Sequence, residues 1–243
     1  MELNAAKRLT ETDDYESEVP ILKQLQQPKV ISADQRLPTT QNETFLEYYF
    51  QTMAGYSDGR TKTNQDAYYI NTCLKRSSKC SLFAVFDGHG PLGHRVSEHL
   101  KKTLTESIEA RFDPDNEYNL NEYTSILEAV CVDINTKLTN NRAINSLFSG
   151  STGIIVLMHN DWIVCANVGD SRAGIIKEED GSYVSLHRLS KDHTPADHKE
   201  KERVIRAGGK VHPCQGRLLV IQTCRETISD RPEYGTVQVK ARD

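Results

Sequence analysis

The chain has 243 residues, of which 37% are hydrophobic and 26% charged, and its formal net charge is −4 at pH 7. This composition is ordinary for a soluble globular protein, and the length allows one large domain or two small ones. The acidic balance argues against a nucleic-acid-binding protein. No apolar run reaches the ~18 residues that a membrane-spanning helix needs, and the polar N-terminal segment is unlike a signal peptide. We therefore expect neither nucleic acid nor a membrane as a partner.

The six cysteines contain no C-x-x-C pair. Cys73, Cys131 and Cys165 lie in segments whose apolar pattern is typical of core strands or helices. Reduced thiols in an intracellular protein explain this distribution better than a disulfide framework does. The cysteines therefore predict a cytoplasmic protein, with the nucleus as an alternative compartment.

The patterning divides the chain into three stretches. Residues 1–44 are polar, contain prolines and show no sustained period, which predicts a flexible or loosely attached N-terminal extension. Residues 45–212 carry the periodic segments of a folded domain. Residues 213–243 lose most of that pattern and are expected to form a divergent C-terminal tail.

Apolar periodicity predicts the first elements of the domain. Residues 45–50 are expected to open it as a strand or an apolar segment, and residues 55–59 to form a turn. Two strands and two helices follow, and each helix carries an apolar stripe suited to covering one face of a sheet. These elements are strands over 67–70 and 82–86, a helix that starts at 91 and ends at 113–116, and a helix over 123–138.

The second half of the domain has the pattern of antiparallel strands. Strands over 153–158 and 162–168 flank the tight turn Asn160–Asp161, which is a strong hairpin pattern. Because successive hairpins pair antiparallel, we expect an α+β fold in which sheets and helices form layers. The later elements are strands over 173–176 and 183–189, a charged helix over 197–207 ended by Gly208–Gly209, a short strand over 218–221 and an irregular segment over 226–243.

The strand over 82–86 breaks at once into Asp87-Gly88-His89-Gly90. Glycine on both sides of His89 lets the main chain turn sharply and lets a ligand approach closely. A carboxylate and an exposed carbonyl are hard ligands suited to Mg²⁺ or Mn²⁺, and a histidine exchanges protons near neutral pH. Two interpretations remain open here: a metal-dependent hydrolytic site, and a glycine-rich turn in which Asp87 caps the following helix.

Asp66 and Asp170 also stand at the ends of expected strands, as Asp87 does. If the strands are neighbours, the three carboxylates would gather in one cleft and repel one another unless cations neutralise them. Two divalent ions ~3.5–4 Å apart would let a shared water attack a phosphoryl group in line. The alternative for Asp170 is that its side chain only anchors the following turn.

Three further side chains complete this hypothetical site. Arg60 and Lys62 precede Asp66 and could hold phosphate oxygens, although they could equally be solvated loop charges. His89 could protonate the departing oxygen, because an alkoxide leaving group needs an acid. Four histidines in the second half of the chain match no compact zinc motif, which argues against a zinc cluster; they are His187, His193, His198 and His212.

Several short motifs occur together in one order. They are Asn64-Gln65-Asp66-Ala67, Phe86-Asp87-Gly88-His89-Gly90, Ser149-Gly150-Ser151-Thr152, Ala166-Asn167-Val168-Gly169-Asp170-Ser171-Arg172, and Asp192-His193 with Glu200-Lys201-Glu202-Arg203 and Gly208-Gly209. With these motifs the chain resembles the PPM-type (type 2C) metal-dependent protein serine/threonine phosphatases over roughly residues 56–211. The resemblance implies an αββα fold, two antiparallel sheets packed face to face with helices outside.

The resemblance also implies a mechanism, in which a metal-bound water attacks phosphoserine or phosphothreonine in protein substrates. We expect the protein to be a monomer. In that mechanism Asp87 bridges two Mg²⁺ or Mn²⁺ ions and the Gly88 carbonyl binds one of them. Asp66 supports the water shell of the ions, and His89 is the general acid. Asp170 matches a position that helps to hold a further, weaker ion.

The same resemblance assigns the phosphate to a basic residue at Arg60 or Lys62. Gln65 stands where many members have a glutamate that reaches a metal through water, so that ion should be held less strongly. The ending departs from the family: an Arg-x-x-Gly-Asp segment, an Asp-Gly segment and an Asp-Asn pair are missing before Asp243. We therefore expect a sandwich that is incomplete at its C-terminal end.

Two hypotheses follow from this comparison of motifs. The first is a phosphatase of this family whose chain is truncated. The second is a phosphatase-like binding or regulatory module without catalysis, because the missing Asp-Gly segment and Asp-Asn pair supply carboxylates for the first metal in the family. A tail from residue 213 that folds poorly is a third interpretation.

Overall fold

A computed structural model describes residues 48–57, 59–179, 182–214, 217–221 and 237–241. The expected N-terminal extension and much of the expected tail lie outside these ranges. The described residues fall into two compact units with a boundary between Asn64 and Gln65.

The smaller unit contains one short hairpin. Strand β1 (Tyr56–Ser57) pairs antiparallel with β2 (Arg60–Thr61), and Gly59 allows the reversal with a positive φ of 77°. The backbone N–H of Lys62 donates to the Gly55 carbonyl at 2.7 Å. The expected turn is therefore present, whereas residues 48–50 form neither helix nor strand, so the opening strand is not found in the described part of 45–50.

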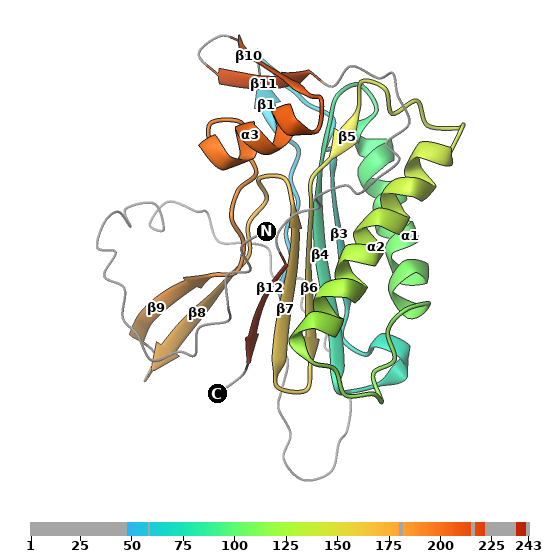
Figure 1. Ribbon diagram of the computed structural model, residues 1–243, viewed down its shortest axis with the longest axis vertical. Helices are drawn as coiled ribbons and strands as arrows, with labels where there is room; N and C mark the ends of the chain where they lie inside the picture. The colour runs from blue at the N-terminus through green and yellow to red at the C-terminus, as the bar shows by residue number, and fades with distance from the viewer. Residues whose placement is uncertain (1–47, 58, 180–181, 215–216, 222–236, 242–243) are drawn as a thin grey trace. The chain divides into compact units, whose positions relative to one another are not determined.

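The larger unit is built on an antiparallel sheet of six strands in the order β12-β7-β6-β4-β3, with β5 paired to the end of β4 (Figure 1). The expected hairpin at 153–168 is confirmed, with Asn160 at a φ of 50° in its turn. The strands are β3 (Asp66–Asn71), β4 (Cys80–His89), β5 (Gly150–Ser151), β6 (Gly153–His159), β7 (Trp162–Val168) and β12 (Val237–Ala241).

Helices α1 (Gly93–Glu109) and α2 (Leu120–Asn140) cover one face of this sheet (Figure 1). Alternate residues of β4 face them, because side chains on a strand point to opposite faces in turn. Leu82 and Phe86 are fully buried there against the apolar stripes of both helices. Burying each such side chain contributes ~1.5–3 kcal/mol. The stripes seen in the sequence are therefore confirmed as the core.

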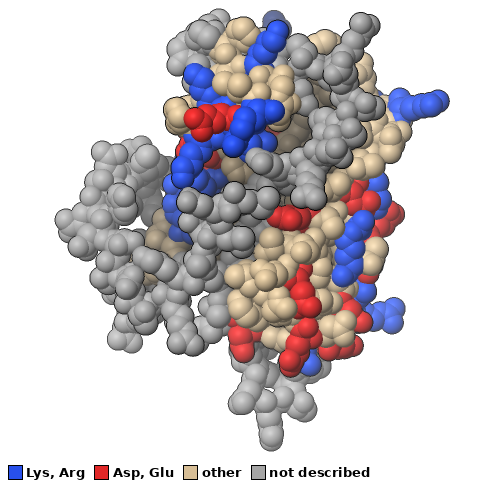
Figure 2. Space-filling model, viewed as in Figure 1, with Lys and Arg blue, Asp and Glu red and all other residues tan. Residues whose placement is uncertain are grey.

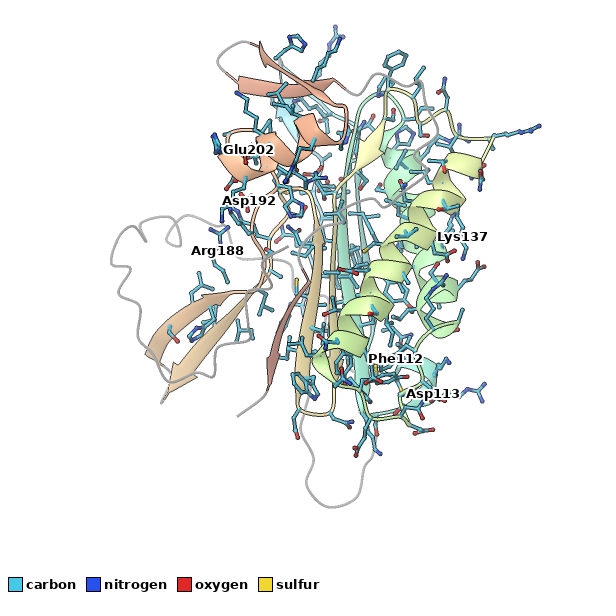
Figure 3. All side chains as sticks on the ribbon, viewed as in Figure 1. Phe112, Asp113, Lys137, Arg188, Asp192 and Glu202 are labelled. Atoms are coloured by element: carbon cyan, nitrogen blue, oxygen red, sulfur yellow. The ribbon has the colours of Figure 1, made fainter. Side chains whose placement is uncertain are left out.

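Two local features define the ends of these helices. Asn119 caps α2, since its side chain accepts hydrogen bonds from the N–H groups of Asn121 and Glu122 while the Glu122 carboxylate accepts from the Asn119 N–H. A short 3₁₀ turn, η1 (Leu74–Arg76), joins β3 to β4. The connection between the helices is acidic, with exposed Asp113 labelled in Figure 3, and Figure 2 shows acidic side chains grouped at this end of the sheet.

The opposite face of the sheet carries a smaller apolar cluster. Buried Ile154, Cys165 and Leu189 form it, and Ile175 of the next hairpin packs against them. That hairpin pairs β8 (Gly174–Glu179) with β9 (Ser182–Arg188), as the sequence predicts. The α+β class with antiparallel pairing and flanking helices is confirmed. The described residues contain one large sheet, so the second sheet of the expected sandwich stays a prediction.

Helix α3 (His198–Arg206) is also confirmed. The Asp197 side chain caps it by accepting from the N–H groups of Lys199 and Glu200, and Gly208 follows it with a φ of 83°. Strands β10 (Lys210–Cys214) and β11 (Arg217–Ile221) then form a hairpin, of which only the second strand was expected.

Two sequence expectations are wrong. Strand β4 does not end before Asp87 but continues to His89, because β5 pairs with Gly88 and His89 and keeps the chain extended. The segment 226–243 is not irregular throughout, because β12 pairs antiparallel with β7. The alternation of apolar and polar residues over Val237–Ala241 is the strand pattern that the sequence interpretation overlooked.

Among the described residues, no helix is both long enough and apolar enough to cross a membrane. Four of the cysteines lie where their state is described, and all four are free thiols: Cys73, Cys80, Cys131 and Cys165. Burial raises the pKa of the Cys131 thiol to about 12, so this cysteine is neutral and unreactive at neutral pH.

Candidate active site

The register of β3 and β4 brings the first two carboxylates together. Asp66 lies directly opposite Asp87 in the antiparallel pair, so both side chains point to the same face at the same end of the sheet. His89 is two residues after Asp87 on the same strand and therefore shares that face. This face is the one opposite α1 and α2. Two carboxylates and an imidazole from adjacent strands thus lie on the same face at the same end of the sheet.

The electrostatics agree with this proximity. The pKa of Asp87 is raised above its ordinary value, first by loss of solvent around its carboxyl group and then by the charges of Asp66 and Asp170. A hydrogen bond between the Asp66 and Asp87 carboxyl groups raises it further, while His89 acts in the opposite direction. The other two predicted carboxylates therefore both act on Asp87. Such a group favours either a proton or a cation.

Thr152 holds the Asp87 backbone from both sides, and the sequence interpretation gave it no role. The Asp87 N–H donates to the Thr152 hydroxyl at 3.1 Å, and the Thr152 N–H donates to the Asp87 carbonyl at 2.9 Å. The Thr152 hydroxyl also pairs with that of Ser171 at 2.6 Å, next to Asp170. Thr152 thus links two of the carboxylate-bearing segments. Its position within the Ser149–Thr152 motif was the available signal.

The backbone around Gly88 is packed too closely for any side chain. A Cβ at Gly88 would lie 2.4 Å from the Gly93 carbonyl oxygen and 2.5 Å from that of Gln65. The Gly88 N–H donates to the same Gln65 carbonyl at 3.1 Å. Glycine therefore allows β3, β4 and the start of α1 to meet at this point.

Gln65 and His89 have defined surroundings beside this point. The Gln65 side-chain amide donates to the Gly90 carbonyl at 2.9 Å, so it braces the loop that leads into α1. The His89 ring lies over Gly150, where a Cβ would come within 2.7 Å of Nε2. His89 itself is exposed, which leaves it accessible to a substrate.

A second network fixes the segment that bears Asp170. Arg172 Nε and its terminal nitrogen donate to both oxygens of Asp192, at 2.9 Å and 2.6 Å. Arg188 donates to the same carboxylate at 3.1 Å; Figure 3 labels Arg188 and Asp192. These bonds lower the pKa of Asp192, first through Arg172. The His193 N–H donates to the Gly169 carbonyl at 2.9 Å, so the two loops are joined on both sides of Asp170.

His193 is neutral in this network. Its Nδ1 accepts from the Gly169 N–H at 3.3 Å, and burial is the main cause that lowers its pKa. The Asp192-His193 motif therefore has a structural function that explains its place in the sequence. It locks the loop after β7 to the loop after β9.

The donor set fits a hard cation incompletely. In the described ranges, no three His, Cys, Asp or Glu side chains are arranged to hold a metal ion. Asp66 and Asp87 nevertheless offer paired carboxylate oxygens whose repulsion a dication would relieve. Mg²⁺ commonly uses one or two carboxylates and keeps several waters, so this pair is compatible with it. The assignments of Gly88 and Asp170 as metal ligands stay predictions.

Arg60 and Lys62 belong to the smaller unit. Both are exposed, on and just after β2. Their assignment to a phosphate group therefore stays a prediction from the resemblance.

Comparison with known proteins agrees with these features. A family model described as Protein phosphatase 2C matches residues 48–226. The chain is 32% identical over 167 residues to Protein phosphatase 1L of Bos taurus, covering 67% of this chain and 45% of that protein. It is 36% identical over 156 residues to Probable protein phosphatase 2C 35 of Arabidopsis thaliana, covering 64% and 43%. The chain thus spans about half the length of the curated relatives it matches.

Solved structures share the fold. A serine-threonine phosphatase 2C from Toxoplasma gondii aligns with a TM-score of 0.56 at 20% identity, over 70% of this chain and 58% of that one. A C. elegans sex determining protein aligns with a TM-score of 0.59 at 22% identity, over 79% and 48%. From the family match and the motifs that carry it, the chain belongs to the protein phosphatase 2C family.

Proposed function

We propose that this protein hydrolyses phosphoserine and phosphothreonine in protein substrates, with Mg²⁺ or Mn²⁺ as cofactor. The observation that supports it most is the pairing of Asp66 with Asp87, two carboxylates that share one face. Loss of solvent and then the Asp66 charge raise the pKa of Asp87. Family membership supplies the phosphoprotein substrate class. We further propose a monomer in the cytoplasm or nucleus.

Asp66 and Asp87 would hold the ions, with the Gly88 carbonyl and Asp170 as additional ligands. Bound Mg²⁺ or Mn²⁺ would supply Lewis-acid chemistry, stabilising charge on the phosphoryl group and lowering the pKa of water. The carboxylates of Asp66 and Asp87 are fixed at strand ends, which limits reorganisation of the site during the reaction.

His89 would donate a proton to the oxygen that leaves the phosphoryl group. An exposed imidazole on the same face as Asp87 can reach a bound substrate, and a serine or threonine alkoxide is a poor leaving group without an acid. Arg60 or Lys62 would bind the phosphate oxygens, an assignment carried by the resemblance alone.

The test compares two substrates with different leaving groups, p-nitrophenyl phosphate and a phosphothreonine peptide, in Mn²⁺. Asp87→Asn is expected to lower kcat/KM for both by ~100-fold or more, because it removes a charge that holds the ion. His89→Gln is expected to lower peptide hydrolysis by ~10²–10⁴-fold and to affect p-nitrophenyl phosphate much less, since nitrophenolate leaves without a proton.

Asp161→Asn is the matched control, because Asp161 is an exposed carboxylate in the β6–β7 turn. It should leave both rates unchanged. If the unaltered chain hydrolyses neither substrate in Mn²⁺ or Mg²⁺, catalysis is refuted and a binding module is favoured. Equal loss in the Asp161 and Asp87 variants would refute the assigned site.

A further inference from the structure

The segment between α2 and β5 exposes two large apolar side chains in succession. Leu147 is 58% exposed and Phe148 is 76% exposed. Isolated apolar residues are common on protein surfaces, whereas exposed apolar residues that adjoin one another are typical of interaction surfaces. Neither side chain is needed for the core described above.

The backbone of this pair is in contact with the catalytic loop. The Ser149 hydroxyl accepts from the Leu92 N–H at 2.8 Å, and Gly150 is the register partner of His89. A Cβ at Gly90 would lie 2.1 Å from the Phe148 carbonyl oxygen, so these two backbones touch. The Phe148 backbone therefore lies beside the loop that carries His89 and Gly90, and Leu147 directly precedes it.

The segment is also held in place before any ligand binds. The Asn141 side chain accepts from the Ala143 N–H at 3.0 Å and pairs with His99 of α1 at 3.3 Å. The Leu147 N–H donates to the Asn145 side chain at 3.2 Å. A surface that is ordered in advance loses little conformational entropy when it binds a partner.

We propose that Leu147 and Phe148 are specificity-determining residues that bind an apolar side chain of the substrate, within a few residues of the phosphorylated one. This inference rests on the proposed function. A polypeptide whose phosphate lies at Asp66 and Asp87 lies close to His89, which shares their face, and the Phe148 backbone adjoins the His89 loop. An aromatic ring and a leucine bind leucine, isoleucine or phenylalanine and give a polar side chain no partner.

The expected size of the preference follows from area. Covering part of one exposed phenylalanine ring removes enough apolar surface from water to change affinity by about tenfold. The probes are two phosphothreonine peptides with a non-hydrolysable phosphonate group, identical except for leucine or serine at the positions flanking it. Binding to the full chain is followed by fluorescence anisotropy in Mn²⁺, and p-nitrophenyl phosphate hydrolysis is measured in parallel.

The unaltered chain should bind the leucine peptide about tenfold more tightly than the serine peptide. Phe148→Ala should remove this preference while leaving serine-peptide affinity and p-nitrophenyl phosphate hydrolysis unchanged. Leu147→Ala should reduce it. Ile205→Ala is the matched control, since Ile205 is 53% exposed on α3 and should leave the preference intact.

Equal binding of the two peptides by the unaltered chain would overturn the inference, as would a preference that survives in the Phe148→Ala variant. Binding of neither peptide would overturn it too. Failure of the proposed function looks different: no hydrolysis of p-nitrophenyl phosphate, with the leucine preference still present and still lost in Phe148→Ala.

Discussion

Gly88→Ala offers a stringent test of how closely the candidate site is packed. The added methyl group would lie 2.4 Å from the Gly93 carbonyl oxygen and 2.5 Å from that of Gln65. Both obstacles are backbone atoms, one in α1 and one immediately before β3, so no side-chain rotation relieves the clash. The contact to Gly93 is about 0.9 Å closer than the ~3.3 Å at which carbon and carbonyl oxygen normally meet.

The cost can be assembled from two contributions. Forcing backbone segments apart in a packed interior costs roughly 1–3 kcal/mol. Separating Gly88 from Gln65 also weakens their 3.1 Å hydrogen bond, worth about 0.5–1.5 kcal/mol. We therefore expect the free energy of unfolding to fall by roughly 2–4 kcal/mol, with a drop in Tm of roughly 5–15 °C.

Urea unfolding followed by circular dichroism measures this loss. Gly153→Ala in β6 is the matched control, because its nearest atoms are in the Phe86 ring at 3.5 Å and 3.6 Å, which is ordinary contact. It should change stability by less than ~1 kcal/mol. A Gly88→Ala variant that unfolds at the same urea concentration as the unaltered protein would refute the packing described here.

Three other changes have defined outcomes. In EDTA, Asp87→Asn should stabilise the protein at pH 7 and should have no such effect below pH ~4. The folded-state pKa of Asp87 is raised, so the unaltered protein loses stability as pH rises through that pKa and Asp87 becomes charged. Asparagine stays neutral and avoids this loss. Asp192→Asn should destabilise the protein at pH 7, because only the charged form of Asp192 pairs with Arg172. The difference in stability from the unaltered protein should vanish as pH falls through the lowered pKa of Asp192. Urea unfolding midpoints from pH 7 to 3 measure the effects of both the Asp87 and the Asp192 variants. Tyr123→Phe should cost about 1–3 kcal/mol in urea unfolding, because it removes the 2.7 Å hydrogen bond to Nδ1 of the fully buried His159 ring; an unchanged midpoint would show that Nδ1 is satisfied otherwise.

Much of the fold was predictable because its information is local. The four-residue spacing in α1 and α2 and the alternation in β6 and β7 are each contained in one segment. Strand β12 was missed although its five residues alternate, because its partner β7 lies far away in the sequence. A strand that pairs with a strand distant in the sequence leaves no local pattern except a short alternation of apolar and polar residues.

The sequence singled out Asp66 and Asp87 but did not specify their geometry. Asp66 and Asp87 were expected to meet only if their strands were neighbours, and the β3–β4 register makes them direct partners. The motif marked Thr152 but not its hydrogen bond to Asp87, because that bond joins segments 65 residues apart. The Gln65 amide likewise binds the Gly90 carbonyl, which spacing alone does not specify.

Calorimetric titration of the full chain with Mn²⁺ tests most directly whether the strand-end carboxylates form a cation site. We expect a saturable heat for the unaltered chain and for Asp161→Asn, and none in the same concentration range for Asp87→Asn. No saturable heat for the unaltered chain, or the same isotherm for Asp87→Asn, would contradict the assignment of Asp66 and Asp87 as metal ligands.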